Sequence, residues 1–252
     1  MAVSLTVLGS SDAFNSGGRG HSCYLLEDAQ GAACIDFGPT AMEALKRLGR
    51  DPNDVDGVYL THLHGDHFAG VHTLLVDAYY RGFRTRPLTV AGPPGTRARV
   101  TDLFALAYRS VAARPPPFPL VIIEYAPGEQ AKILGRTVSV FQADHQDPPD
   151  EVACLLRIDD GERVLAFSGD TGWTDELIPA SAGADLFVCE CSFHSTEVPQ
   201  HLTWLQLEPK LGELSAKRVL LTHLSDEMRA HADEPVRSGK AEVADDGLRI
   251  DL

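Results

Sequence analysis

The chain has 252 residues, of which 44% are hydrophobic and 23% are charged, as is ordinary for a folded α/β protein of this length. Its formal net charge of −14 argues against binding nucleic acid through bulk electrostatic attraction. Five scattered cysteines argue against a disulfide framework. The N-terminus lacks a basic, apolar leader and no apolar run reaches membrane-spanning length, so we expect one cytoplasmic domain over residues 1–252 without membrane contact.

Short apolar strands alternate with helical segments along the chain, which predicts an α/β fold. In the first half we expect strands at 4–8, 24–26, 33–36, 58–60 and 88–91, and helices at 40–48, 71–80 and 96–108. In the second half we expect strands at 121–125, 137–142, 153–158, 163–167, 185–190 and 218–222, and a helix at 202–211. Asp159-Asp160-Gly161 predicts a hairpin turn. The tail after Ser225 is polar and weakly patterned.

A dense group of metal-competent side chains follows the predicted strand 58–60. It lies in the stretch Thr61-His62-Leu63-His64-Gly65-Asp66-His67. Neutral imidazoles and carboxylates are ligands for zinc and similar ions, and packing three His and one Asp into six residues has few other uses. A lone His is more often structural, but this full string predicts a metal site on a loop at a strand end.

Further candidate ligands follow later strands in the same way. His145, Asp170 and His223 each lie just beyond the end of a predicted strand. Leu221-Thr222-His223-Leu224 also echoes Leu60-Thr61-His62-Leu63, as expected if two similar β/α halves face each other. Each residue alone has a structural alternative, and Asp170 in particular could cap a turn. Their shared placement favours a ligand role.

This ordered set resembles the metallo-β-lactamase superfamily, over nearly the whole chain from Leu5 to Ser225. The resemblance implies an αβ/βα four-layer sandwich, with two mixed sheets flanked by helices and a two-metal site at the sheet edge. It implies that His62, His64 and His145 hold one metal, that Asp66, His67 and His223 hold the second, and that Asp170 bridges them. Two adjacent cations lower the pKa of a shared water and so generate a bridging hydroxide near neutral pH. We expect Zn²⁺, although Mn²⁺ and Fe²⁺ accept the same ligands.

Comparison with three groups of superfamily members narrows the range of reactions that this chain could catalyse. Flavo-diiron reductases usually have Glu at position 64, where this chain has His64, and zinc β-lactamases typically have Cys at position 170, where this chain has Asp170. The region from Ala184 to Thr203 resembles ribonuclease Z-like phosphodiesterases. Glu190 falls on the Glu of their His-Glu-Ala-Thr motif and His201 on the His of their His-Ser-Thr motif. Cys189 and Leu202 depart from those motifs.

This resemblance implies that His201 assists the leaving group or the phosphate charge and that Glu190 holds it, so we take Asp66, His201 and Glu190 as catalytic residues. The alternative is that Glu190 is a structural ion and that His201 begins a surface helix. Only 24 residues, 146–169, separate His145 from Asp170, which leaves no room for a tRNA-binding arm. We therefore expect a small anionic ester, such as a cyclic nucleotide, as substrate, and we regard tRNA as unsupported.

The sequence alone leaves other functions, the oligomeric state and some substrate contacts open. The same metals would serve a lactonase, thioesterase or arylsulfatase, and a non-catalytic metal-bound sensor belongs to a different class. A homodimer is possible because relatives are commonly dimers. His21, His194 and the arginines between Arg81 and Arg114 are undecided as substrate contacts. Cys189 and Cys191 lack a second Cys pair, so we expect them to pack as small hydrophobic residues.

Overall fold

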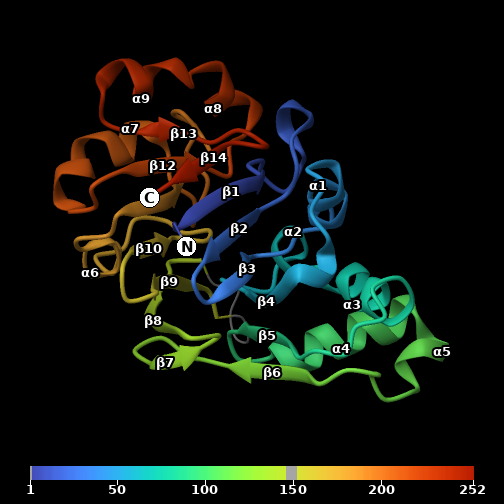
Figure 1. Ribbon diagram of the computed structural model, residues 1–252. Helices are drawn as coiled ribbons and strands as arrows, with labels where there is room; N and C mark the ends of the chain where they lie inside the picture. Colours follow the sequence, from blue (N-terminus) through green and yellow to red (C-terminus); the bar gives the residue numbers. More distant parts are fainter. Residues whose placement is uncertain (1, 146–151) are drawn as a thin grey trace.

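The computed structural model describes residues 2–145 and 152–252, and it consists of two sheets packed face to face with helices on their outer faces (Figure 1). The first sheet has the order β14-β1-β2-β3-β4-β5-β6. Its strands are β1 (Ser4–Gly9), β2 (Cys23–Asp28), β3 (Gly31–Ile35), β4 (Val55–Tyr59), β5 (Leu88–Gly92), β6 (Leu120–Glu124) and β14 (Arg249–Asp251). The pairs from β14 to β3 are antiparallel, and those from β3 to β6 are parallel.

The second sheet repeats this mixture with the order β13-β12-β11-β10-β9-β8-β7. Its strands are β7 (Gln130–Ile133), β8 (Arg136–Gln142), β9 (Cys154–Asp159), β10 (Val164–Phe167), β11 (Leu186–Glu190), β12 (Val219–Thr222) and β13 (Glu242–Val243). Strands β7 to β10 are antiparallel, and β10 to β13 are parallel. The β9–β10 hairpin predicted from Asp159-Asp160-Gly161 is confirmed.

The helices are short and lie on the outer faces of the two sheets. They are α1 (Ala41–Arg47), α2 (Gly65–Phe68), α3 (Val71–Tyr80), α4 (Thr96–Ala107), α5 (Arg109–Ala112), α6 (Leu177–Ser181), α7 (Trp204–Leu207), α8 (Asp226–Ala230) and α9 (Asp233–Ser238). Three 3₁₀ turns span Ser16–Gly18, Pro52–Asp54 and Glu208–Glu213. Among the described residues, no helix has both the length and the apolar character needed to cross a bilayer.

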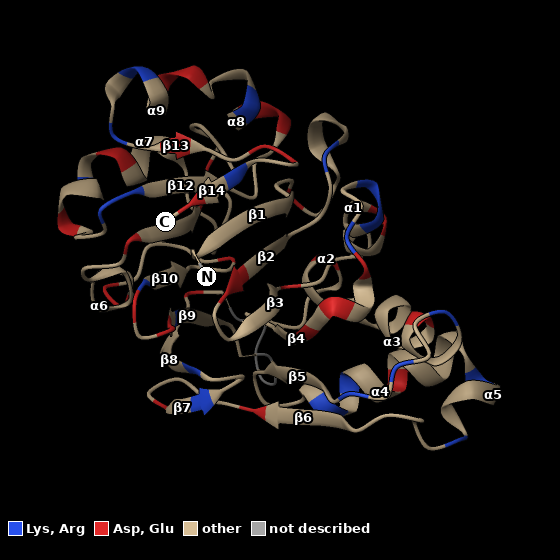
Figure 2. Ribbon diagram, viewed as in Figure 1, with Lys and Arg blue, Asp and Glu red and all other residues tan. Residues whose placement is uncertain are grey.

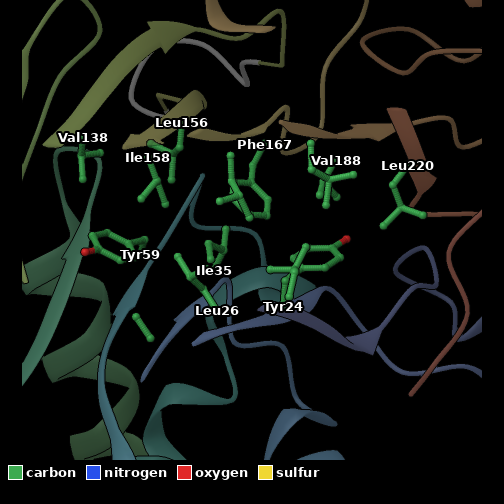
Figure 3. Close-up of a cluster of buried hydrophobic side chains, with 14 of the residues drawn as sticks. Tyr24, Leu26, Ile35, Tyr59, Val138, Leu156, Ile158, Phe167, Val188 and Leu220 are labelled. Carbon is green, nitrogen blue, oxygen red and sulfur yellow. The ribbon is translucent and has the colours of Figure 1, made fainter. Parts of the chain in front are cut away.

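Three hydrophobic clusters hold these layers together. The central cluster joins the inner faces of the sheets: Tyr24, Leu26, Ile35 and Tyr59 of the first sheet face Leu156, Phe167 and Val188 of the second (Figure 3). Two outer clusters bury α1, α3 and α4 against the first sheet, and α6, α7 and α8 against the second. The predicted four-layer αβ/βα sandwich is therefore confirmed. All five cysteines are buried and free, as expected for Cys189 and Cys191.

The tail after Ser225 is more regular than its sequence predicts. It forms α8, α9, β13 and β14, and β14 pairs with β1 through Leu5 and Ile250. These elements have two to six residues, too few for a periodic pattern to show. The predicted helix 202–211 is also divided, because Pro209 follows α7 and the chain continues as a 3₁₀ turn.

Six strands end at the same edge of the sandwich, and their ends carry the polar residues. Asp36 follows β3, the histidine motif follows β4, and His145 follows β8. Asp170 follows β10, Ser192 follows β11 and His223 follows β12. Open α/β sheets place ligand sites beyond the carboxyl ends of their parallel strands, so the topology brings residues from six segments to one place.

Candidate metal centre

The structure brings all seven predicted metal ligands together at this edge. His62, His64 and His145 offer nitrogen atoms that lie within 4.8 Å of one another, and a second such group contains Asp66, His67, Asp170 and His223. Asp170 lies between the groups. Its Oδ2 is 3.3 Å from His223 Nε2 and 3.9 Å from His62 Nε2, while its Oδ1 is 3.2 Å from His67 Nε2. This carboxylate therefore reaches both groups.

The centre contains buried polar atoms that receive no hydrogen bond from the described residues. These atoms are His62 Nε2, His67 Nε2 and Asp170 Oδ1, of which the last two lie 3.2 Å apart as an ion pair. Burying such atoms without a partner costs about 1–3 kcal/mol each. His145 Nε2 and His64 Nδ1 also lie 3.0 Å apart, each aimed at the other. Because these donors are imidazoles and carboxylates, the residues present fit divalent metal ions.

The opposite edges of the imidazole rings are held by acceptors. His67 Nδ1 donates to Asp36 Oδ2 at 2.7 Å, and His145 Nδ1 donates to the Gln200 carbonyl at 3.1 Å. The Thr61 hydroxyl donates to Asp36, so it accepts from His62 Nδ1 at 3.0 Å. Such partners fix the tautomer and leave the Nε2 lone pairs of these rings facing inward.

His223 is fixed in the same way from the second half of the chain. Its Nδ1 lies 2.9 Å from Ser192 Oγ, which in turn donates to Glu190 Oε2 at 2.8 Å. His223 and Asp36 both have left-handed backbone angles, with φ values of 58° and 54°. Non-glycine residues rarely adopt this conformation, and such strain gathers at functional sites.

A glycine allows the loop that carries Asp170 to approach the histidine motif. Gly169 has φ 54°, and a Cβ atom on it would lie 2.7 Å from Thr61 Cβ. Any side chain at this position would push the Asp170 loop away from Thr61 and His62. The glycine in the Ser168-Gly169-Asp170 turn is therefore required by close contact as well as by backbone angle.

The charges within the centre are strongly coupled. Burial opposes protonation of His67, but Asp170, Asp66 and Asp36 outweigh burial and raise its pKa. Burial also opposes protonation of His223, but Asp170 and Asp66 raise its pKa to about 9. Conversely, burial and the neighbouring His67 lower the pKa of His62. The Asp-rich group of ligands thus attracts positive charge strongly, which is the condition for holding a cation.

His201 and Glu190 form a pair beside the ligands. Glu190 is fully buried, and its Oε1 accepts from His201 Nδ1 at 2.7 Å. Backbone amides of Thr171 and Leu202 also donate to this carboxylate, at 3.1 and 3.0 Å. The His201 ring stacks with His223, with 5.8 Å between ring centroids, and meets the His145 ring edge-on at 4.9 Å. Burial opposes protonation of His201, but the hydrogen bond and charge of Glu190 raise its pKa.

Sequence analysis did not identify the residues that form hydrogen bonds with Nδ1 of the imidazole rings. These residues are Asp36, Thr61, Ser192 and Gln200. Asp36 carried a usable signal, because it is a carboxylate directly after an apolar strand that ends at the same edge as the motif. Ser192 likewise follows β11 by two residues. Gln200 contributes only its backbone carbonyl, and side-chain identity gives no signal for that role.

His21 and His194, which the sequence left undecided as substrate contacts, lie outside the ligand groups. His21 contacts the Ala13 carbonyl at 3.3 Å and Asn15 at 3.4 Å within its own loop. His194 joins His231 and Glu234 in a separate group, which we call the outer histidine cluster. Neither His21 nor His194 belongs to the candidate ligand groups.

The arginines between Arg81 and Arg114 make several contacts with protein acceptors. Arg84 is buried and donates to the carbonyls of Asn53, Arg86 and Pro87. Arg86 pairs with Asp56, and Arg97 donates to the Ile122 carbonyl. The basic residues of α4 and α5 are arginines, and both basic and acidic segments are spread over the rest of the molecule (Figure 2). The sequence left these arginines undecided as substrate contacts, and the contacts of Arg84, Arg86 and Arg97 described here are with protein acceptors.

Comparison with known proteins agrees with this fold. A family model described as a beta-lactamase superfamily domain matches residues 33–224. The chain is 25% identical over 256 residues to the probable metallo-hydrolase YhfI of Bacillus subtilis, covering 98% of both. It is 25% identical over 280 residues to ribonuclease Z of Mycobacterium bovis, covering 99% of this chain and 98% of that protein.

Solved structures show the same architecture. The crystal structure of YhfI superposes with a TM-score of 0.78 at 23% identity, over 99% of both chains. A diphosphatase of the PhnP family superposes with a TM-score of 0.77 at 18% identity, over 99% of this chain and 98% of that one.

The chain belongs to the beta-lactamase superfamily, because the family model covers more than half of it. Within that superfamily it is a hydrolase, and its His and Asp clusters indicate binding of divalent metal. The resemblance inferred from His62 to His223 is therefore confirmed.

Proposed function

We propose that this protein is a phosphodiesterase that hydrolyses small phosphodiesters with two divalent metal ions, Zn²⁺ in the first instance. His62, His64 and His145 would hold one ion, Asp66, His67 and His223 the other, and Asp170 would lie between them. When bound, the ions supply Lewis-acid activation of water and stabilise negative charge on the phosphoryl oxygens. The names ribonuclease and diphosphatase among the compared proteins support chemistry at phosphorus.

The observation that carries the proposal is the His201–Glu190 pair. Hydrolysis of a phosphodiester forms a bond between water oxygen and phosphorus and breaks the bond to the alcohol oxygen. An unactivated alkoxide needs a proton as it leaves, whereas a good leaving group such as p-nitrophenolate does not. Since Nδ1 of His201 is bound to Glu190, Nε2 is the nitrogen that donates this proton.

Glu190 is a positioning residue in this scheme. Its carboxylate is buried and receives hydrogen bonds from Ser192 and from the backbone of Leu202, so it cannot rotate away from His201 without losing them. It therefore orients the His201 ring and favours its charged form. The proton given to the alcohol is restored to His201 from the attacking water, so the cycle balances.

His201→Ala tests the proposal with two diesters that share a methyl group and differ in their leaving group. We expect kcat for methyl phenyl phosphate to fall about 100-fold or more, and kcat for methyl p-nitrophenyl phosphate to fall far less. Metal content, measured on the same samples, should be unchanged. An equal loss with both diesters would contradict proton donation by His201.

A wider substrate panel separates the proposal from its alternatives. A lactone, a thioester and an aryl sulfate should be hydrolysed more slowly than methyl phenyl phosphate under identical metal loading. Preference for one of those esters would replace the phosphodiesterase proposal with the corresponding activity. No turnover of any ester by the metal-loaded protein would favour a non-catalytic, metal-bound sensor. Sedimentation of the same preparation tests whether the protein forms the homodimer that the sequence left open.

A further inference from the structure

A cavity of about 530 Å³ adjoins His201, and none of the seven candidate metal ligands lines it. It lies between the loop after β10, which carries Gly172 and Trp173, and the segment that runs from Glu197 through His201 to Lys210. Its size is within the range of about 300–1,000 Å³ that is usual for small-molecule sites. The structure thus offers space for part of a substrate next to the proposed proton donor.

The cavity and the candidate metal centre share a wall. Asp144 lines the cavity and precedes His145, while Gln200 lines it and accepts a hydrogen bond from His145 Nδ1. Gly172 donates to the Asp144 carbonyl at 2.9 Å, and a Cβ on Gly172 would meet Asp144 Oδ2 at 2.6 Å. A group that enters this cavity is therefore separated from the ligands only by residues that also hold them.

The position of His201 identifies which end of a diester the cavity accepts. The proton donor must contact the oxygen of the departing alcohol. His201 lines the cavity, and its Nδ1 is hydrogen-bonded to Glu190, which leaves Nε2 for the alcohol oxygen. An alcohol whose oxygen lies at His201 therefore extends into the cavity, while the phosphoryl group faces the ligands.

The lining indicates the chemistry of that alcohol. Trp173 is half-buried, packs against the outer hydrophobic cluster of the second sheet and lines the cavity, and Lys210 Nζ lies 4.1 Å from its ring centroid. Asp144 and Glu197 also line the cavity and offset the single positive charge of Lys210, so a second anionic group is not favoured. Val198 and Pro199 add apolar surface. These features suit an uncharged alcohol with an aromatic ring.

We propose that this cavity is the leaving-group subsite, and that it selects diesters whose departing alcohol carries a flat, uncharged aromatic ring packed on Trp173. This inference rests on the proposed phosphodiesterase function. Lys210 acts as a positioning residue, because its ammonium group over the indole restrains the ring. The aromatic ring can belong to a simple aryl alcohol or to a nucleoside, and the experiment distinguishes these sources.

The test compares leaving groups of similar acidity and different shape. Methyl phenyl phosphate releases phenol, and methyl hexafluoroisopropyl phosphate releases a non-aromatic alcohol of comparable acidity. We expect Trp173→Leu to lower kcat/KM for the phenyl ester about tenfold, in keeping with the worth of aromatic stacking, and to change the other ester less than twofold. Trp173→Phe should retain most of the preference. Equal losses with both esters would overturn the subsite.

A third substrate, the 5′-O-methyl phosphate diester of adenosine, shows which source is preferred. A larger loss for this ester than for the phenyl ester on Trp173→Leu identifies a nucleoside as the better occupant, and a smaller loss identifies a simple aryl alcohol. Lys210→Met should produce a loss in the same direction, whereas Lys132→Met, at an exposed position on β7, should have no effect. Equal effects of the two lysine variants would contradict a role for Lys210.

Binding can be measured separately from turnover. Trp204 is 1% exposed, whereas Trp173 is partly exposed, so a ligand in the cavity should quench mainly the fluorescence of Trp173. We expect adenosine or phenol to quench the metal-free wild type but not Trp173→Phe. If the wild type hydrolyses no diester, the proposed function fails. In that case the titration tests only whether the cavity binds an aromatic ring. Quenching at Trp173 supports an aromatic subsite, and unchanged fluorescence overturns it.

Discussion

In the described part of the chain, the candidate metal centre and the outer histidine cluster both gather histidines and carboxylates, but they differ in how their polar atoms are satisfied. In the candidate metal centre, Nδ1 of His67 and His145 is held by Asp36 and Gln200, while the buried His62 Nε2 receives no hydrogen bond from the described residues. In the outer histidine cluster, His194 Nε2 contacts Glu234 Oε2 at 2.9 Å. In the candidate metal centre, hydrogen bonds therefore hold the outer edges of the imidazole rings, and the inward-facing atoms stay available to a cation.

The outer histidine cluster is closed by its own contacts. The rings of His194 and His231 stack with 3.9 Å between centroids and 12° between planes, and His231 Nδ1 donates to the Glu227 carbonyl at 3.0 Å. A metal ion lies in the plane of each imidazole that binds it, and two stacked rings share no such plane. Proximity of ligand types is therefore insufficient, and the directions of the lone pairs decide whether a cation fits.

The largest expected effect is at the residue that joins the two ligand groups. Asp170→Ala should lower turnover at least about 100-fold, because loss of metal removes several kcal/mol of transition-state stabilisation. Metal content measured by mass spectrometry should fall in the same samples. The matched control is Glu234→Ala in the outer histidine cluster, which should keep both properties. Loss of metal from Glu234→Ala would contradict the assignment of metal binding to the candidate metal centre and not to the outer histidine cluster.

A smaller loss is expected at the outer partner of the ligands. Asp36→Asn should weaken metal binding about 10–100-fold, because the acceptor that fixes the tautomer of His67 is replaced by a weaker one. A competition titration with a metal-binding dye measures this affinity directly. The corresponding change in the outer cluster, Glu234→Gln, should leave the affinity unaltered. Wild-type affinity in Asp36→Asn would show that the carboxylate does not orient His67.

Removal of metal should also lower stability. An ion present at about 100 times its dissociation constant stabilises the native state by about 2.7 kcal/mol, so chelation should lower Tm by about 5–10 °C in a chain of this size. Asp170→Ala should respond little to the chelator, while Glu234→Ala should respond like the wild type. Calorimetry with and without chelator provides the measurement, and identical responses of these two variants would contradict the assignment.

The smallest effect is expected beside the outer histidine cluster and depends on pH. Slight burial opposes ionisation of Glu227, but hydrogen bonds from Ser195 and Thr196 lower its pKa from 4.5 to about 2. A lowered native pKa stabilises the fold above pH 4.5, and this contribution is lost as the pH falls toward 2.

Glu227→Gln tests that dependence. The difference in free energy of unfolding between wild type and variant should be about 1 kcal/mol or less at pH 6, since Glu227 lies near the surface, and should shrink at pH 3. Urea denaturation at both pH values measures the difference. A difference that grows on acidification would contradict the direction of the pKa shift. Metal content should be the same in both proteins.

Much of the fold and of the ligand set could be predicted from sequence. The apolar strands, the hairpin at Asp159-Asp160-Gly161 and the tight histidine motif are local patterns, because each depends on the spacing of a few neighbouring residues. Placement after a strand also singled out His145, Asp170 and His223. The single-domain prediction for residues 1–252 and the assignment of catalytic roles to Asp66, His201 and Glu190 stay predictions.

The tertiary structure alone decided which distant groups satisfy one another. The strand β14 exists as an edge partner of β1, and the cavity beside Trp173 exists because the loop after β10 meets the segment before α7. Asp36 is a partner of His67 only because β3 and β4 are adjacent and end together. Side-chain type can be read along a chain, but the direction of a lone pair depends on backbone angles and on contacts between residues far apart in sequence.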